Sequence, residues 1–541
     1  MKAPRLLVLF FLLAVPCSCG PSTPDEAGAL GSSESREALF DSILAWTADR
    51  AAFSPVKNRT LGFDPLEAMA GLRQSVVEAS SEEEFFYALH RVSNARRDRH
   101  LSVALVPGGL TLDHEAGLPA WDREEPPEPF SAPVRLLPDF SRDHAGFFIA
   151  DVASGAGVDG PLPELGDGVI SVNGRDPAAL MEMARWYIRH SSIPGLRWKL
   201  AEALPLNTAI LPPEFRGESL ELEVLKPDGS SVSFSLPYLD PEEMDWTDWA
   251  EPAYPGFVLE FSNPTFDLYL PEDDRNLVLL LWHRFSSTLI EDVDRLMDFA
   301  QERGLLDRAV IFDATRSGGG SLGAYAVQRL QPKPFKTTFG TLQISDVIEP
   351  FVAERRAAFE NRRVYDGAGP ETVDDGTWLL DWLENEVLQD LEAGKEVTEP
   401  VPFKLAHAPK DLDGILQPAP VHFRGPFLVF SGPDGGSHLD QFMSIVVDNE
   451  LGPVFGMDAG GYSNTWEWEE VLHYPGTDQP VVGFMWNIGH TIRPNGEILE
   501  GNPASVTHPL PLTAENAGEY HETLLAEALT YLASVGFDVG G

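Results

Sequence analysis

Cysteine is almost absent from this 541-residue sequence, which contains only Cys17 and Cys19, both close to the N-terminus. The rest of the chain therefore has no disulfide, no thiol nucleophile and no cysteine-based metal site. A His-Glu-x-x-His motif, a Walker phosphate-binding loop and a dinucleotide-binding fingerprint are missing as well. We therefore predict a protein without a metal or another cofactor.

Basic residues are scarce, since 39 lysines and arginines stand against 84 aspartates and glutamates, for a formal net charge of -45. Nucleic-acid backbones and anionic lipid surfaces would repel such a chain. A solvated acidic surface is the simplest interpretation of this excess, and attraction of cationic substrates is the alternative. We predict no nucleic-acid partner.

Long apolar runs are missing, apart from a short one at Leu6–Val15 that follows two basic residues. This run is about half as long as a membrane-spanning helix requires. The pattern is typical of a signal peptide, which we assign to residues 1–19. Cys19, or else Cys17, occupies the place where bacterial lipoprotein signals carry the lipidated cysteine, and plain secretion is the alternative. We expect an exported protein that is a cell-envelope lipoprotein or a periplasmic protein, with secretion as the other possibility. Its only expected membrane contact is an N-terminal lipid anchor.

The remaining composition fits a folded protein of several units. Hydrophobic residues make up 43% of the chain, which is typical of globular proteins. A polar tether at 20–36 precedes a helical N-terminal unit at 37–112, in which apolar residues recur at helical spacing. Residues 113–140 are rich in Pro, Asp and Glu and are predicted to be a linker. The N-terminal unit is expected to contain helical stretches at Leu39–Trp46, Leu66–Val77 and Phe85–Val92 and a strand at Leu101–Val106.

Residues 141–240 have strand patterns with few helices, including a hairpin across Asp228-Gly229. The segment Gly166-Asp167-Gly168-Val169-Ile170-Ser171-Val172-Asn173-Gly174 resembles the Gly-Asp-x-Ile-x-x-Val-Asn-Gly segment of PDZ domains. This resemblance implies a mainly β PDZ-like domain that captures an extended peptide by strand addition. Another small β domain with the same kind of turn is the alternative.

Residues 241–541 alternate strands with helices, which is the pattern of an α/β core. A polar insertion at about 332–423 interrupts this alternation, and we place it outside the central sheet. Strands are predicted at Leu277–Trp282, Ala309–Phe312, Pro426–Phe430 and Pro453–Gly456, and helices at Leu289–Arg303, Leu322–Leu330, His438–Val447 and Ala514–Ala533.

Two loops of this core carry residues with chemical potential. Ser437 lies between a strand and an apolar helix, where its hydroxyl could act as a nucleophile favoured by the helix dipole. The alternative is a capping box in which Ser437 and Asp440 satisfy the first N–H groups of the helix. Leu439 excludes the Gly-x-Ser-x-Gly elbow of α/β-hydrolases. The glycines at 318–320 could bind a phosphate, face an oxyanion or simply form a turn.

Several motifs resemble, in order, those of the C-terminal-processing and tricorn-like serine peptidases, most closely the branch of the chlamydial protease-like activity factor. They span nearly the whole chain after the signal. Arg97-Asp98-Arg99-His100 is similar to the segment that carries the base of this family, and Ser437–Phe442 to its nucleophile segment. The other similar segments are Val310–Gly320, with its glycine turn, Asp448–Gly461 and the glutamate segment Gly496–Pro503.

The resemblance implies a crotonase-like α/β core and a serine mechanism. Ser437 would be the nucleophile, His100 the base, and Glu500 the acid that orients His100 directly or through a water. The N–H groups of Gly319 and His438 would form the oxyanion hole. Gly320 and Asp440 are secondary candidates. His438 is the competing base by adjacency, but neighbouring side chains on a helix diverge by about 100°.

Some residues depart from the family pattern. Asp440 replaces a glutamate, Ser317 an asparagine, and Pro503 interrupts the glutamate segment. No lysine follows Lys410, so the lysine base of the processing-protease branch has no counterpart. We predict an exported serine endopeptidase that acts on polypeptides through an acyl-enzyme, with no prediction of oligomeric state. A catalytically inactive peptide-binding lipoprotein and a serine esterase are the alternatives.

Overall fold

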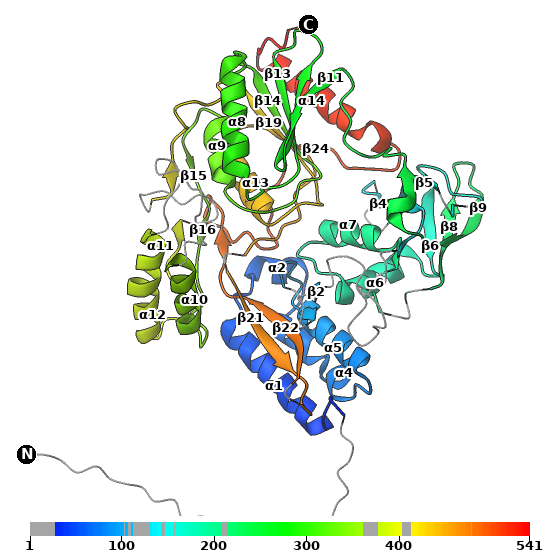
Figure 1. Ribbon diagram of the computed structural model, residues 1–541, viewed down its shortest axis with the longest axis vertical. Helices are drawn as coiled ribbons and strands as arrows, with labels where there is room; N and C mark the ends of the chain where they lie inside the picture. The colour runs from blue at the N-terminus through cyan, green and yellow to red at the C-terminus, as the bar shows by residue number, and fades with distance from the viewer. Residues whose placement is uncertain are drawn as a thin grey trace, which may run out of the picture.

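The computed structural model describes residues 28–540 except 102, 106–109, 112–129, 142–145, 156, 159, 208–210, 213–214, 216, 361–376, 403–412, 465 and 478. The predicted signal peptide, both cysteines and most of the predicted linker lie outside the described residues. Figure 1 shows a helical N-terminal unit at the bottom, a β-rich second unit at the side and a sheet flanked by helices at the top. No described helix combines the length and the apolar character needed to cross a membrane.

Short helices make up most of the N-terminal unit: α1 (Ser33–Arg50), α2 (Pro55–Thr60), α3 (Pro65–Ala70), α4 (Arg73–Val77) and α5 (Glu82–Asn94). The predicted tether extends too far, because Ser32 caps α1 by accepting a hydrogen bond from the N–H of Ser35. The helix therefore begins before residue 36.

The N-terminal unit is completed by a hairpin from the other end of the chain. Strand β1 (Val103–Leu105), in the predicted strand region, pairs antiparallel with β2 (Leu110–Thr111) and with β22 (Pro480–Asn487). Strand β22 pairs in turn with β21 (Glu467–His473). Residues of α1, α5 and β22 share one hydrophobic cluster, in which Phe40, Phe86 and Trp486 are fully buried. A division of the chain in sequence order does not capture this unit.

The second unit is a curved antiparallel sheet with two helices. Its strands follow the order β10-β5-β6-β8-β9, and β4 pairs with β5. The prediction of a linker at 113–140 is wrong at its C-terminal end, since Phe130 to Pro138 contribute two strands. The elements are β3 (Phe130–Ser131), β4 (Val134–Pro138), β5 (Phe147–Gly155), β6 (Gly168–Val172), α6 (Pro177–Tyr187), α7 (Ile193–Ala203), β7 (Leu206–Asn207), β8 (Ser219–Leu225), β9 (Ser231–Pro237), a 3-10 turn at Pro241–Glu243 and β10 (Met244–Trp246).

The core is a seven-stranded sheet in the order β11-β12-β13-β14-β19-β20-β24. The strands that run parallel in this sheet are β13, β14, β19, β20 and β24. At one edge, β11 and β12 are antiparallel to their neighbours. The sequence pattern predicted β13, β14, β19 and β20 but missed β11, β12 and β24. The strands are β11 (Phe257–Ser262), β12 (Phe266–Pro271), β13 (Leu277–Trp282), β14 (Ala309–Ala314), β19 (Phe427–Ser431), β20 (Val454–Gly456) and β24 (His508–Pro509).

Helices cover both faces of this sheet, which explains why its central strands are continuously apolar. One face packs on α8 (Leu289–Glu302), α9 (Gly323–Leu330) and α13 (His438–Asp448). The other face packs on α14 (Tyr520–Ser534), which follows a 3-10 turn at Ala517–Glu519, and on Phe148 and Trp198 of the second unit. The second unit is thus docked directly on the core.

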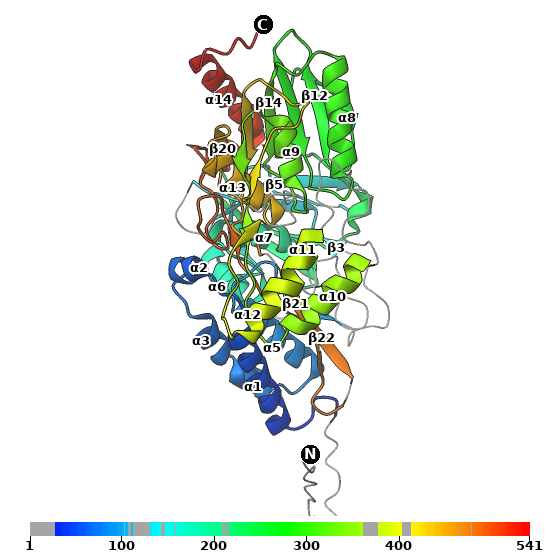
Figure 2. The ribbon, with the colours of Figure 1, turned by 90° about the vertical axis from the view of Figure 1, so that its left-hand side faces the viewer.

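The insertion lies beside the N-terminal unit, as Figure 2 shows from a second side. None of its described residues joins the seven-stranded sheet. Ile348, Phe351 and Trp382 instead pack in the hydrophobic cluster of the N-terminal unit. Its elements are β15 (Phe335–Lys336), β16 (Phe339–Gly340), α10 (Ile348–Glu360), α11 (Thr377–Trp382), a π-helical turn at Leu383–Val387, α12 (Leu388–Glu392), β17 (Val401–Pro402) and β18 (Ile415–Leu416), and β16 also pairs with β23 (Thr491–Ile492).

Candidate active site

Ser437 stands at the turn between β19 and α13, immediately before His438 begins the helix. Its backbone angles are φ 59° and ψ -122°, which residues other than glycine rarely adopt. The turn is tight enough that a Cβ on Gly436 would lie 1.8 Å from the ring of Tyr462. The Ser437 side chain makes no capping hydrogen bond. The capping-box interpretation is therefore wrong, and the hydroxyl is turned toward a partner outside the helix.

Asp440 holds a neighbouring turn rather than the helix start. Its carboxylate accepts hydrogen bonds from the N–H of Gly461 at 3.1 Å and of Tyr462 at 2.9 Å. The carbonyl of Tyr462 accepts in turn from the N–H of Ser437 at 2.7 Å. Burial raises the pKa of Asp440 well above its usual value. Asp440 therefore supports the backbone of the serine turn, and its carboxylate oxygens are both engaged by that turn.

His100 is the hydrogen-bond partner of the Ser437 hydroxyl. It lies in the segment between α5 and β1, and its Nε2 is 2.9 Å from the Ser437 Oγ. The ring also packs edge-on against Tyr462, with the ring centroids 5.1 Å apart. Burial lowers the pKa of His100 to about 4. The imidazole is therefore neutral at physiological pH, with Nε2 able to accept the serine proton.

His438 does not reach the serine hydroxyl in this way. Its side chain is buried, and its Nε2 accepts a hydrogen bond from the N–H of Gly323. Burial lowers the pKa of His438 to about 3. The ring points into the core beside Phe285, at a centroid distance of 5.1 Å. Of the two histidines, only His100 is hydrogen-bonded to Ser437.

The glycine turn after β14 lies directly against the serine. A Cβ added to Gly319 would lie 2.7 Å from the Cβ of Ser437 and 3.2 Å from its Oγ. Gly320 has φ 140° and forms a bridge with Phe285, where an added Cβ would lie 1.8 Å from a carbonyl oxygen. The predicted oxyanion turn is therefore brought to Ser437, and a side chain at either glycine would force the turn or its neighbours to shift.

Glu500 is fully buried, and both of its carboxylate oxygens accept hydrogen bonds. Its Oε1 accepts from Lys57 Nζ at 3.1 Å, and its Oε2 accepts from the N–H of Ser463 at 2.9 Å. Burial raises the pKa of Glu500 to about 7. No direct hydrogen bond joins Glu500 to His100 within the described residues, where the buried Nδ1 of His100 has no hydrogen-bond partner. The acid is thus near the base but separated from it.

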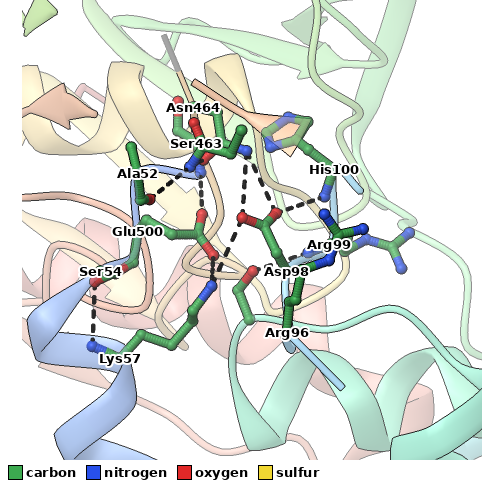
Figure 3. A network of polar contacts seen from close by, with 12 residues as sticks. Ala52, Ser54, Lys57, Arg96, Asp98, Arg99, His100, Ser463, Asn464 and Glu500 are labelled. Atoms are coloured by element: carbon green, nitrogen blue, oxygen red, sulfur yellow. Dashed lines mark hydrogen bonds and ion pairs between the residues drawn. The ribbon is translucent and has the colours of Figure 1, made fainter. Parts of the chain in front are cut away.

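Asp98 is the second buried carboxylate beside His100, as Figure 3 shows. It accepts from the backbone N–H of His100 at 3.0 Å, and Asn464 Nδ2 lies 3.4 Å from both of its oxygens. Lys57 Nζ lies 3.6 Å from it. Burial alone would raise the pKa of Asp98, but the charge of Lys57, the hydrogen bond from the His100 N–H and the charge of Arg96 leave it below its usual value.

Asp98, His100 and Glu500 each place one potential ligand atom within 4.8 Å of the others. That spacing alone would suit a cation. The ammonium of Lys57, however, already lies within 3.6 Å of both carboxylates. The positive charge of a side chain thus takes the position that a metal ion would need.

The sequence analysis gave no role to two charged residues of the site, Lys57 and Asp98. Lys57, on α2, lies 443 positions before Glu500 in the sequence. A single lysine on a short helix carries no signal of such a role. Asp98 stood in the segment that resembled the base segment of the family, but no role was assigned to it. Cys17 and Cys19, the lipidation candidates, lie outside the described residues.

Of three comparisons with known proteins, the search of solved structures gives matches to this chain. A scan against protein-family models and a search of curated proteins give no match. Among solved structures, the chain is similar to mature CPAF, with a TM-score of 0.69 and 15% identity over 94% of this chain and 99% of that chain. It is also similar to mature CPAF complexed with lactacystin, with a TM-score of 0.68 and 14% identity over 93% and 98%. The predicted resemblance to these serine peptidases, most closely to the branch of the chlamydial protease-like activity factor, is thereby confirmed at the level of the fold: this chain has a fold similar to that of CPAF.

Proposed function

We propose that this protein is an exported serine endopeptidase that hydrolyses peptide bonds through an acyl-enzyme. The observation that carries this proposal is the 2.9 Å contact between Ser437 Oγ and His100 Nε2. A serine in a strained turn at a helix N-terminus, paired with a neutral imidazole, is the arrangement that activates a hydroxyl for attack on a carbonyl. The similarity to CPAF over 94% of this chain supports a peptidase rather than another use of the fold.

The proposed first step begins with His100 taking the hydroxyl proton of Ser437 as Oγ attacks the peptide carbonyl. The new C–O bond forms as the carbonyl π pair moves to oxygen, which becomes an oxyanion. The C–N bond then breaks, and the imidazolium of His100 gives its proton to the leaving amine. Water enters next and repeats the sequence, which releases the second product and restores Ser437.

The oxyanion would be held by the N–H groups of Gly319 and His438. Gly319 packs against the Ser437 side chain, and His438 is the first residue of α13, whose N-terminal N–H groups and dipole favour negative charge. Removing one such donor typically slows turnover by about 100- to 1,000-fold. As part of this proposal, the second unit is a PDZ-like domain and the core has the crotonase-like fold.

Glu500 would stabilise the imidazolium of His100. Oxygen and nitrogen atoms of Glu500, Asp98 and His100 lie within 4.8 Å of one another, a span that one bridging water covers. Asp98 is the nearer supporting group in the chain, because it fixes the His100 backbone. In this arrangement Glu500 acts on His100 through space or through a water.

A cavity between the second unit and the core supports a polypeptide substrate. It has a volume of about 430 Å³ and is lined by β4, β5 and the end of α7 in the second unit. Arg316 and Asp434 of the core also line it, and each lies three positions before a proposed active-site residue. Peptide docking at the second unit would therefore shift the loops that carry Gly319 and Ser437. Full activity after deletion of residues 141–240 would contradict this gating.

The proposed function is tested by labelling with a fluorophosphonate probe, which reacts with activated serines. We expect the mature wild type to be labelled and both Ser437→Ala and His100→Ala, checked for folding by circular dichroism, to lose labelling. Cleavage of unfolded polypeptides then separates a peptidase from an esterase. An unlabelled, folded wild type would instead favour an inactive peptide-binding protein.

A further inference from the structure

Lys57 is a buried lysine between two buried carboxylates, far from any position that the sequence marks as functional. Its Nζ lies 3.1 Å from Glu500 Oε1 and 3.6 Å from Asp98 Oδ2, and its side chain is only 4% exposed. Figure 3 shows it reaching between the two acids, with His100 beyond Asp98. A lysine is rarely buried unless paired, so a specific role is indicated.

The helix that carries Lys57 is fastened to the segment of Glu500. Ser54 caps α2 by accepting from the N–H of Lys57 at 3.2 Å, and its hydroxyl donates to the carbonyl oxygen of Glu500. Gly501 has φ 73°, and a Cβ added there would lie 2.3 Å from the Cβ of Lys57. The backbone of residues 500–501 and the first turn of α2 are therefore in direct contact, which fixes the direction of the lysine side chain.

Charge gives this contact its importance. Two carboxylates close together in a buried site cannot both remain ionised without a compensating cation. His100 supplies none in the resting site, because burial lowers its pKa to about 4. Lys57 lowers the pKa of both Glu500 and Asp98, and so opposes the effect of their burial. The other charged and titratable groups facing these three residues are Arg96, Arg99, Arg189, His190, Asp440, Glu467 and His490.

We propose that Lys57 is a positioning residue of the active site, which holds the carboxylates of Glu500 and Asp98 in place around His100 and supplies the charge that lets both serve the imidazolium. This role rests on the proposed serine-peptidase function and adds a residue to it. Lys57 acts through the two acids and does not touch Ser437.

The role predicts a specific change with pH. Labelling of Ser437 by the fluorophosphonate probe should need neutral His100 and ionised Glu500, whose pKa is raised to about 7 by burial. The wild-type labelling rate should therefore rise as pH increases through about 7. In Lys57→Met the opposing charge is gone, the pKa of Glu500 rises further, and the rise in rate moves to higher pH by about one unit or more.

The experiment measures labelling rates from pH 5 to pH 9 for the wild type, Lys57→Met and Lys57→Arg. We expect Lys57→Met to be slowed about tenfold or more at pH 7 with its profile displaced upward, and Lys57→Arg to keep the wild-type midpoint. Lys226→Met is the matched control, because Lys226 also joins two carboxylates, Asp167 at 2.8 Å and Glu164 at 3.3 Å, but in the second unit. Its profile should equal that of the wild type.

A second comparison covers the case in which Lys57→Met does not fold. Lys57→Met/Glu500→Gln/Asp98→Asn removes the charges of Lys57 and of both acids, and it should label at the same rate and with the same pH profile as Glu500→Gln/Asp98→Asn. A triple variant slower than Glu500→Gln/Asp98→Asn at every pH would contradict action through the two acids. A labelled wild type whose profile is unchanged in Lys57→Met would overturn the role of Lys57 alone. A wild type that is not labelled at any pH would overturn the proposed function, and this role with it.

Discussion

Arg493 forms a buried ion pair with Asp448, in which Nε and Nη2 each donate to one carboxylate oxygen, at 3.1 Å and 2.6 Å. Asp448 is the last residue of α13, the helix that starts after Ser437. The same guanidinium donates through Nη1 to the carbonyls of Asn502 and Pro503, just after Glu500. One side chain thus ties the far end of the nucleophile helix to the segment of the acid.

Arg493→Met should destabilise the fold strongly, because it leaves the buried Asp448 carboxylate without its cation. We expect a loss of about 3–5 kcal/mol in the free energy of unfolding, measured with urea. Arg424→Met is the matched control: Arg424 pairs with Asp307 in the same two-bond geometry, but both side chains are largely exposed. That loss should be much smaller than the loss for Arg493→Met. Equal losses in the two variants would contradict the assigned importance of burial.

The backbone of Ser437 predicts a difference between two inactive variants. Both Ser437→Ala and Ser437→Gly lack the hydroxyl, but only glycine adopts φ 59° and ψ -122° without strain. We therefore expect Ser437→Gly to be more stable than Ser437→Ala by about 1 kcal/mol or more in thermal unfolding. Ser444→Gly, inside α13, should be destabilised instead. A less stable Ser437→Gly would show that the turn is not strained.

Gly319→Ala should abolish most labelling while leaving the protein folded. The added methyl would lie 2.7 Å from the Cβ of Ser437, so the serine or the glycine turn must move. We expect a labelling rate lower by about 100-fold or more, as for loss of an oxyanion donor. Gly318→Ala is the control, since its methyl would meet only ordinary contacts, the nearest at 3.7 Å from Arg284. Similar rates for both variants would refute the placement of the oxyanion turn.

Buried histidines predict sensitivity to acid. Burial lowers the pKa of His90 and His438 to about 3, and of His100, His190, His490 and His521 to about 4. In the unfolded chain these histidines bind protons below about pH 6.5. In the folded chain they stay unprotonated until about pH 4. Stability should therefore be complete above this window and fall as pH decreases through it.

Buried acids oppose this trend only in part. Burial raises the pKa of Glu467 and Glu500 to about 7 and also raises the pKa of Glu202, Asp440 and Asp458, so these groups favour the folded state as pH falls toward their unfolded values. The six histidines still outnumber these five acids, so we expect lower stability at pH 5 than at pH 7. Urea unfolding at these two pH values checks this expectation, and equal stabilities would contradict it.

The core could be predicted because its strands and helices follow strong local patterns. Leu277–Trp282 and Ala309–Ala314 are apolar runs buried on both faces, and α13 has a clear apolar side. Strand β4 was missed because it follows a segment rich in Pro and charged residues. Its hydrophobic residues are buried only in the folded second unit, where β4 pairs with β5. Strand β11 is largely exposed at the sheet edge and has little pattern of its own.

The site divides in the same way. Ser437, His100 and the glycine turn stand in segments with family-like patterns, and the structure brings them together. Lys57 could not be predicted, because its partners come from positions 98 and 500 and only the tertiary fold brings them near. Non-local pairing of this kind leaves no periodicity or spacing in the sequence.

The pairing of β1 with β22 has a consequence for the order of synthesis. A nascent chain that has just passed Ser437 already contains His100, but β22 and Glu500 have not yet been made. The sheet that anchors the His100 segment is then incomplete, and Lys57 lacks one of its two acids. The proposed site is therefore complete only after residues 480–500 have been made and have folded back onto the N-terminal unit.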